Sequence, residues 1–93
     1  MSALVRIPTP LRSFTGGAHE VRVEGATVRD ALAALERTHD GVLARVLDER
    51  GAVRPFVNVF VGDRNIKSLD GLATPLAEGA VLSIVPAVAG GRA

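Results

Sequence analysis

The residues whose types and spacing point to chemistry lie near the C-terminal end, where Gly90-Gly91 is followed by Arg92-Ala93. The other glycine pair, Gly16-Gly17, stands between two predicted strands and is explained as a turn. Gly90-Gly91 joins no two elements. Glycine has no Cβ and tolerates any backbone region, so such a pair suits a chain end that enters a narrow channel and offers its terminal carboxylate to another enzyme. The alternative is an inert terminal tail.

Residues for conventional catalysis are not brought together by the sequence. His19 and His39 fall on different predicted elements, and Ser13 and Thr15 lie in a loop without a nearby base. Cysteine is absent, which excludes a disulfide scaffold, a thiolate metal site and a cysteine nucleophile. We therefore predict no catalytic residue, no metal site and no bound cofactor: the chain is not an enzyme, but a protein on which enzymes act.

Composition limits the classes of partner. The 93 residues suit one domain, with 47% hydrophobic and 23% charged residues. A net charge of +1 with scattered basic residues, and an aromatic content of 3%, argue against nucleic-acid binding. No signal peptide or stretch long enough to span a bilayer is evident, so we expect a cytoplasmic protein that does not associate with membranes.

The pattern predicts two strands, one main helix, and then further strands. Thr27 is the predicted N-cap of the helix, whose buried stripe is Val28, Ala31, Leu32 and Leu35. Asp40-Gly41 ends it, with Gly41 as a left-handed cap. The other predicted elements are strand 3–7, loop 8–17, strand 19–24, a helical turn over 42–47, strand 56–61, an edge strand at 65–66, a turn or short helix over 68–72, and strand 81–85, ended by Pro86.

This order predicts an α+β fold of the ubiquitin-like β-grasp type. A mixed sheet of four to five strands would carry the one main helix across one face. The first two strands would form a hairpin, and the last would return parallel to the first through a right-handed crossover. We expect a β-grasp domain over 1–86 and a flexible tail over 87–93.

Alternation along the central strand separates two faces. We assign Val57, Val59 and Val61 to the core. Phe60 would then lie on the open face beside Ser83 and Val85, as a candidate partner surface; the alternative places Phe60 in the core. The arginines Arg12, Arg54 and Arg64 are either rim contacts for an acidic partner or solvated surface residues.

The ending Val85-Pro86-Ala87-Val88-Ala89-Gly90-Gly91 resembles that of the MoaD/ThiS family of ubiquitin-like sulfur carriers. Further blocks resemble its CysO-type branch, which serves bacterial cysteine biosynthesis: Ile7-Pro8-Thr9, Leu11-Arg12, Thr15-Gly16-Gly17, Phe56-Val57-Asn58 and Gly71-Leu72-Ala73-Thr74.

The resemblance implies a sulfur carrier. A ubiquitin-activating-like adenylyltransferase and sulfurtransferase would use ATP to adenylate the carboxylate of Gly91 and convert it to a thiocarboxylate. The sulfur would pass to an activated serine derivative held by a pyridoxal-phosphate cysteine synthase. The tail residues Ala87, Val88, Ala89 and Gly90 would lie in the partner's channel.

Arg92-Ala93 departs from this pattern, because while it is attached Gly91 has no free carboxylate. We therefore expect cleavage between Gly91 and Arg92 by a zinc metalloprotease of the deubiquitinase-like type. The alternatives are the small subunit of molybdopterin synthase, another carrier of the MoaD/ThiS type, a ubiquitin-like protein modifier, and a plain interaction module with an inert tail.

Overall fold

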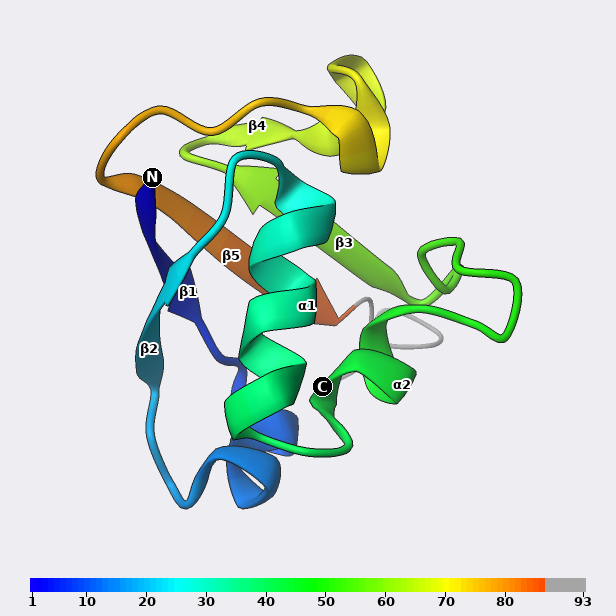
Figure 1. Cartoon of the computed structure of the whole chain (residues 1–93). Helices are drawn as coiled ribbons and strands as arrows, with labels where there is room; N and C mark the ends of the chain where they lie inside the picture. The colour runs from blue at the N-terminus through cyan, green and yellow to red at the C-terminus, as the bar shows by residue number, and fades with distance from the viewer. Residues whose placement is uncertain (87–93) are drawn as a thin grey trace.

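The computed structural model describes residues 1–86, which form a five-stranded mixed sheet with helix α1 across one face (Figure 1). The strand order is β2-β1-β5-β3-β4. The strands are β1 (Ser2–Arg6), β2 (Glu20–Glu24), β3 (Val57–Val61), β4 (Arg64–Asn65) and β5 (Ala80–Pro86). The helices are α1 (Val28–Thr38), α2 (Val42–Val46) and three 3₁₀ segments, η1 (Thr9–Thr15), η2 (Ile66–Ser68) and η3 (Gly71–Ala73).

The sheet pairing confirms the predicted topology. Strands β1 and β2 are antiparallel, with Leu4 opposite Arg22. Strand β5 lies parallel to β1 and antiparallel to β3, so it occupies the middle of the sheet. A parallel neighbour requires a crossover, and α1 supplies it. This arrangement is the ubiquitin-like β-grasp.

Helix α1 forms where local signals are strongest. The Thr27 hydroxyl accepts a hydrogen bond from the Asp30 N–H at 3.2 Å, as an N-cap does. The predicted stripe of α1 is buried, together with Ala34. It packs on the core face of the sheet, where Val5, Val59 and Leu82 are at most 1% exposed.

Several predicted boundaries were wrong. Loop 8–17 contains η1, since Pro10 fits the first turn of a helix. The edge strand is Arg64–Asn65, and Ile66 instead begins η2 and is buried. Phe56 precedes β3 and is exposed, so the strand is one residue shorter than predicted.

The corner between α1 and α2 also differs from the prediction. Gly41 does adopt a left-handed conformation, with φ of 100°, but α1 already ends at Thr38, and Gly41 is instead the N-cap of α2. A Cβ built on Gly41 would lie 2.9 Å from Cδ1 of Phe14, so both its backbone conformation and its surroundings favour glycine.

Glu36 fixes this corner through its carboxylate. The Gly41 N–H donates to Oε2 at 3.0 Å, and the Leu43 N–H donates to Oε1 at 2.8 Å. These donors at Gly41 and Leu43 hold the pKa of the Glu36 carboxyl below its ordinary value. The carboxylate thus satisfies backbone groups at the start of a short helix.

Glu36→Gln is expected to lower the free energy of unfolding by about 1 kcal/mol at neutral pH, because the amide is a weaker acceptor than the carboxylate. Because the pKa of Glu36 is lower in the folded state than in the unfolded state, the ionised carboxylate stabilises the fold. This stabilisation is fully present above the unfolded-state pKa of about 4.3 and is lost as the pH falls through the folded-state pKa. Urea denaturation at pH 7 and at about pH 3 measures the difference, which should shrink in acid. A difference that is the same at both pH values would contradict this role.

Candidate functional site

The site predicted at the chain end follows directly from β5. Pro86, the last residue of β5, lies opposite Val57 of β3, and β5 is held between β1 and β3. The pairing with β1 reaches Ser83, so the described chain ends at Pro86 beside β3. The predicted tail and processing residues, Ala87, Val88, Ala89, Gly90, Gly91 and Arg92, lie outside the described residues, and their roles stay predictions.

The predicted partner residues share the face of the sheet opposite α1. Phe60 lies opposite Ser83, and Val85, two residues further along β5, lies opposite Asn58. Val57 and Val59 are buried and Phe60 is half-buried, which confirms the assignment of the two faces. Leu4 and Val81, opposite each other on β1 and β5, continue the same surface. We call these five residues, Leu4, Phe60, Val81, Ser83 and Val85, the sheet-face patch.

Polar contacts border the sheet-face patch on both sides. On β2, Glu20 pairs with Arg6 at 3.7 Å, and Glu24 pairs with the N-terminal amine at 3.3 Å. On β4, the Asn65 side-chain amide donates to Asn58 Oδ1 at 3.3 Å. The patch is thus a mainly apolar strip, with Ser83 as its polar member, and the polar side chains on either side of it already have partners within the chain. Such a surface suits a protein partner.

The three predicted rim arginines do not gather on this face. Arg64 is exposed on β4. The Arg12 Nε–H donates to the Ile7 carbonyl at 3.1 Å, and the Arg54 Nε–H donates to the Ala44 carbonyl at 2.9 Å. Arg12 and Arg54 therefore stabilise the backbone of the folded domain.

Sequence reasoning missed Leu4, Val81 and Phe56. The period-two pattern of the first and last strands could have identified Leu4 and Val81 once Val5 and Leu82 were assigned to the core. Phe56 was read as part of the strand, yet it precedes β3 and is 63% exposed, an unusual position for a phenylalanine.

No acid–base constellation is present in residues 1–86. His19 and His39 lie on separate segments, and no group of three potential ligands gathers there for a metal ion. Asp48, like Glu36, has its pKa lowered mainly by a backbone donor, here the Ala52 N–H. Both carboxylates therefore serve turns. No helix in these residues is long and apolar enough to cross a membrane.

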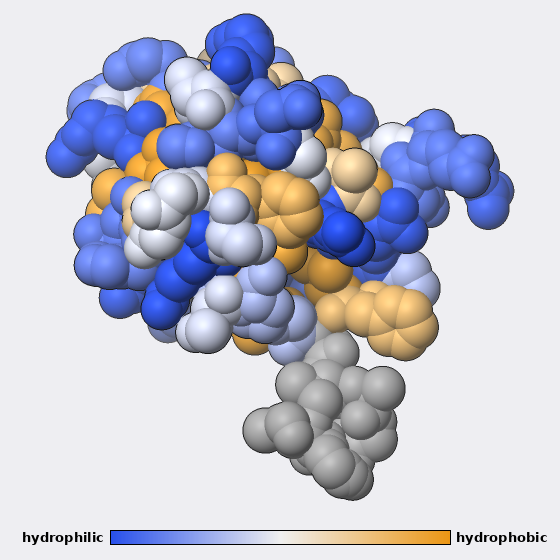
Figure 2. Space-filling model, turned by 90° about the horizontal axis from the view of Figure 1, so that it is seen from below, coloured by the Kyte–Doolittle hydropathy of each residue, from blue (hydrophilic) through white to orange (hydrophobic). Residues whose placement is uncertain are grey.

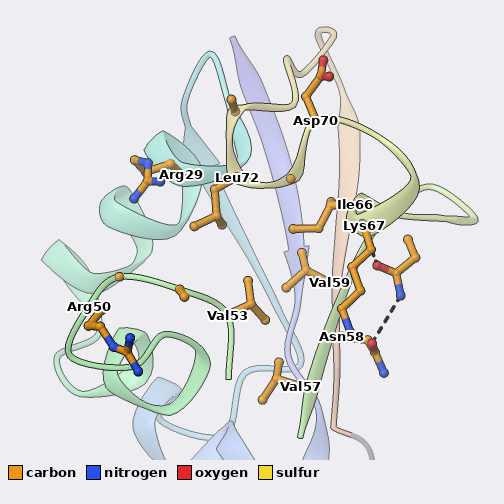
Figure 3. A pocket seen from close by; sticks show the side chains of 15 residues that line it. Arg29, Arg50, Val53, Val57, Asn58, Val59, Ile66, Lys67, Asp70 and Leu72 are labelled. Carbon is orange, nitrogen blue, oxygen red and sulfur yellow. Dashed lines mark hydrogen bonds between the residues drawn. The ribbon is translucent and has the colours of Figure 1, made fainter. Parts of the chain in front are cut away.

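A cavity of about 460 Å³ lies on the helix side of the sheet (Figure 3). Val53, Val59 and Ile66 form its apolar centre, and Arg29, Arg50 and Lys67 stand around it. Asp70 is its one lining carboxylate, and no histidine or hydroxyl side chain lines it. This composition provides no nucleophile activated by a base.

The sequence and the fold were compared with known proteins. The sequence model of the ThiS family matches residues 5–91. This chain belongs to the ThiS family.

Among relatives of this ThiS-family chain, the sulfur carrier protein CysO of Mycobacterium tuberculosis is 40% identical over 93 residues, covering 98% of this chain and 100% of that protein. Small archaeal modifier protein 3 of Haloferax volcanii is 44% identical over 68 residues, 73% of each chain. The fold resembles CysO in the Amycolatopsis orientalis BexX/CysO complex, with a TM-score of 0.90 and 40% identity, covering 96% of this chain and 99% of that one. The resemblance to the MoaD/ThiS family and its CysO-type branch is confirmed.

Proposed function

We propose that this ThiS-family chain is a sulfur carrier whose C-terminal Gly91 is adenylated, converted to a thiocarboxylate and used as the sulfur donor for cysteine biosynthesis. The observation that carries the proposal is the extent of the family match, which ends at Gly91 and leaves Arg92-Ala93 outside it. Similarity to CysO over nearly the whole chain supports the cysteine branch.

The chemistry begins with removal of Arg92-Ala93, which frees the carboxylate of Gly91. A zinc metalloprotease of the deubiquitinase-like type would hydrolyse this peptide bond. An oxygen of the carboxylate then attacks the α-phosphorus of ATP, and pyrophosphate leaves. A hydrosulfide ion then attacks the carbonyl carbon of the acyl adenylate, the bond to phosphate breaks and AMP leaves, which gives the thiocarboxylate.

The carrier contributes binding rather than catalysis in these steps. ATP would be bound by the activating adenylyltransferase and sulfurtransferase, and pyridoxal phosphate by the cysteine synthase that accepts the sulfur. The sheet-face patch, which leads along β5 to Pro86, would lie against these enzymes while the tail enters their channels. The recorded complex of a related CysO with BexX supports a carrier that works through protein contacts.

A second candidate is a protein modifier joined through Gly91 to lysine side chains. The similarity to small archaeal modifier protein 3 favours it. Both functions share adenylation of Gly91 and differ in the group that attacks the adenylate, which is sulfur in one and a lysine amine in the other.

Reconstitution tests the proposed function. Chains ending at Gly91 and at Ala93 are each incubated with the activating enzyme of the native host, ATP and a sulfide source, and then weighed by mass spectrometry. The Gly91 chain should exchange one oxygen for sulfur, and the Ala93 chain should stay unchanged. Modification of both chains, or of neither, would contradict the proposal. Adducts on lysines in extract, without thiocarboxylate, would favour the modifier.

A further inference from the structure

A second surface lies near the end of β5, on the face of the sheet opposite the sheet-face patch. It is a pocket of about 570 Å³, which we call the Phe14–Phe56 pocket. Its lining residues are Phe14, Gly41, Ala44, Arg45, Arg54, Phe56 and Val57. Val57 lies opposite Pro86, so the pocket adjoins the point at which the described chain ends.

Aromatic side chains form the apolar part of this pocket. Phe56 is 63% exposed and is one of three large hydrophobic residues exposed in the described chain. Phe14 is half-buried and is held against Gly41, where a Cβ would collide with its ring. Figure 2 views this end of the molecule and shows hydrophobic side chains at the surface, interrupted by strongly hydrophilic ones. An exposed phenylalanine gains free energy when a partner covers it.

Two arginines supply the polar part, and both are held in place. The Arg45 guanidinium lies 5.2 Å from the centroid of the Phe14 ring, within the range of a cation–π contact. The Arg54 Nε–H is used by the Ala44 carbonyl, which leaves the outer nitrogens of that guanidinium for a ligand. A guanidinium fixed in this way loses less entropy when it binds a carboxylate.

No carboxylate lines the pocket, and neither ion pair within residues 1–86 involves Arg45 or Arg54. In sequence, the nearest acidic residue to Arg45 is Asp48 and the nearest to Arg54 is Glu49. Asp48 Oδ1 accepts from the N–H groups of Ala52 and Arg50, and the charge of Arg54 helps to lower the Asp48 pKa without forming an ion pair with it. Both positive charges therefore remain available to a partner of opposite charge.

The short distance between Gly91 and the end of β5 brings an enzyme that acts on Gly91 close to this pocket. Gly91 is five residues beyond Pro86, so an extended chain places it within roughly 18 Å of the end of β5. An enzyme is wider than this distance. When its active site holds Gly91, its surface must therefore contact the part of the domain around Pro86.

We propose that the Phe14–Phe56 pocket docks an acidic surface of the enzyme that activates Gly91, with carboxylates on Arg45 and Arg54 and an apolar side chain over Phe56. This inference rests on the proposed function, and it adds a basic, aromatic contact to the apolar sheet-face patch. The charged pair would speed association and orient the enzyme, and Phe56 would lengthen the lifetime of the complex.

The test uses chains ending at Gly91 and ATP–pyrophosphate exchange catalysed by the activating enzyme of the native host. Arg45→Glu/Arg54→Glu should raise KM for the carrier at least ~10-fold, while kcat at saturation stays within about twofold. The matched control, Arg29→Glu/Arg37→Glu on the exposed side of α1, makes the same change of charge and should leave KM within about twofold of wild type. Higher salt should raise KM for the wild type and the control more than for the pocket variant.

A second variant distinguishes weaker docking from a loss of folded protein. Phe56→Ala removes a side chain that is mostly exposed, so its Tm should match the wild type while KM rises about threefold or more. A KM for both pocket variants equal to that of the control would overturn the inference and leave the proposed function intact. Absence of exchange with the wild-type chain would overturn the proposed function and the inference with it.

Discussion

A chain carrying Gly90→Val is expected to fold like the wild type and to lose nearly all activation at Gly91. The buried hydrophobic residues of the described chain lie between Ala3 and Ile84, and glycine has no side chain of its own to pack, so we expect the fold to tolerate the change. Valine adds a branched Cβ that narrows the accessible backbone conformations and widens the chain. In a channel shaped for glycine, both effects oppose reaction at the neighbouring carboxylate.

The measurement pairs thermal unfolding with ATP–pyrophosphate exchange, on chains ending at Gly91. Exchange should fall by about two orders of magnitude or more, since misplacing a reacting group by about 1 Å can cost this much. The Tm should be unchanged.

A matched control comes from a glycine inside the fold. Gly62, in the turn between β3 and β4, has φ of 63° and nothing within 4 Å of a built Cβ. Gly62→Val should therefore cost roughly 1–2 kcal/mol of stability through its backbone conformation alone, and activation should persist. If Gly90→Val unfolds the protein and Gly62→Val does not, the glycine at position 90 is structural and the account of the tail is wrong.

The parts of the fold that depend on local signals could be predicted from the sequence. The Thr27 cap, the stripe along α1 and the alternation in β2 each involve residues a few positions apart, so their patterns are readable without a structure. The parallel pairing of β5 with β1 also followed, because the order of elements leaves few alternatives for one helix on one sheet.

Features that depend on contacts between distant segments could not be predicted in this way. A glycine with positive φ can end one helix or begin the next. At Gly41 the N–H groups of Gly41 and Leu43 donate to the carboxylate of Glu36, a side-chain contact across the corner that the residue pattern alone does not reveal. The Phe14–Phe56 pocket brings together η1, α2 and the residues before β3, and no single stretch of sequence carries that arrangement.

Some features of the candidate site could also be predicted from the sequence, and others could not. The glycine pair and its position after the last strand were visible in the sequence; the family model extends through Gly91, and the role of this residue stays a prediction. Which face of β3 points outward was open until the burial of Val57 and Val59 showed that Phe60 lies on the face opposite the core.

Trimming at Gly91 has the largest chemical consequence, because an amide at this position leaves no carboxylate to adenylate. Under the proposed function, Arg92-Ala93 would have to be removed before Gly91 could be activated, so we expect untrimmed protein to be inert in activation even when it is fully folded.

The most direct measurement is the intact mass of the protein purified from its native host under conditions that preserve thiocarboxylates. We expect chains that end at Gly91, a fraction of them with one oxygen replaced by sulfur. A population consisting entirely of chains that end at Ala93 would contradict the central claim.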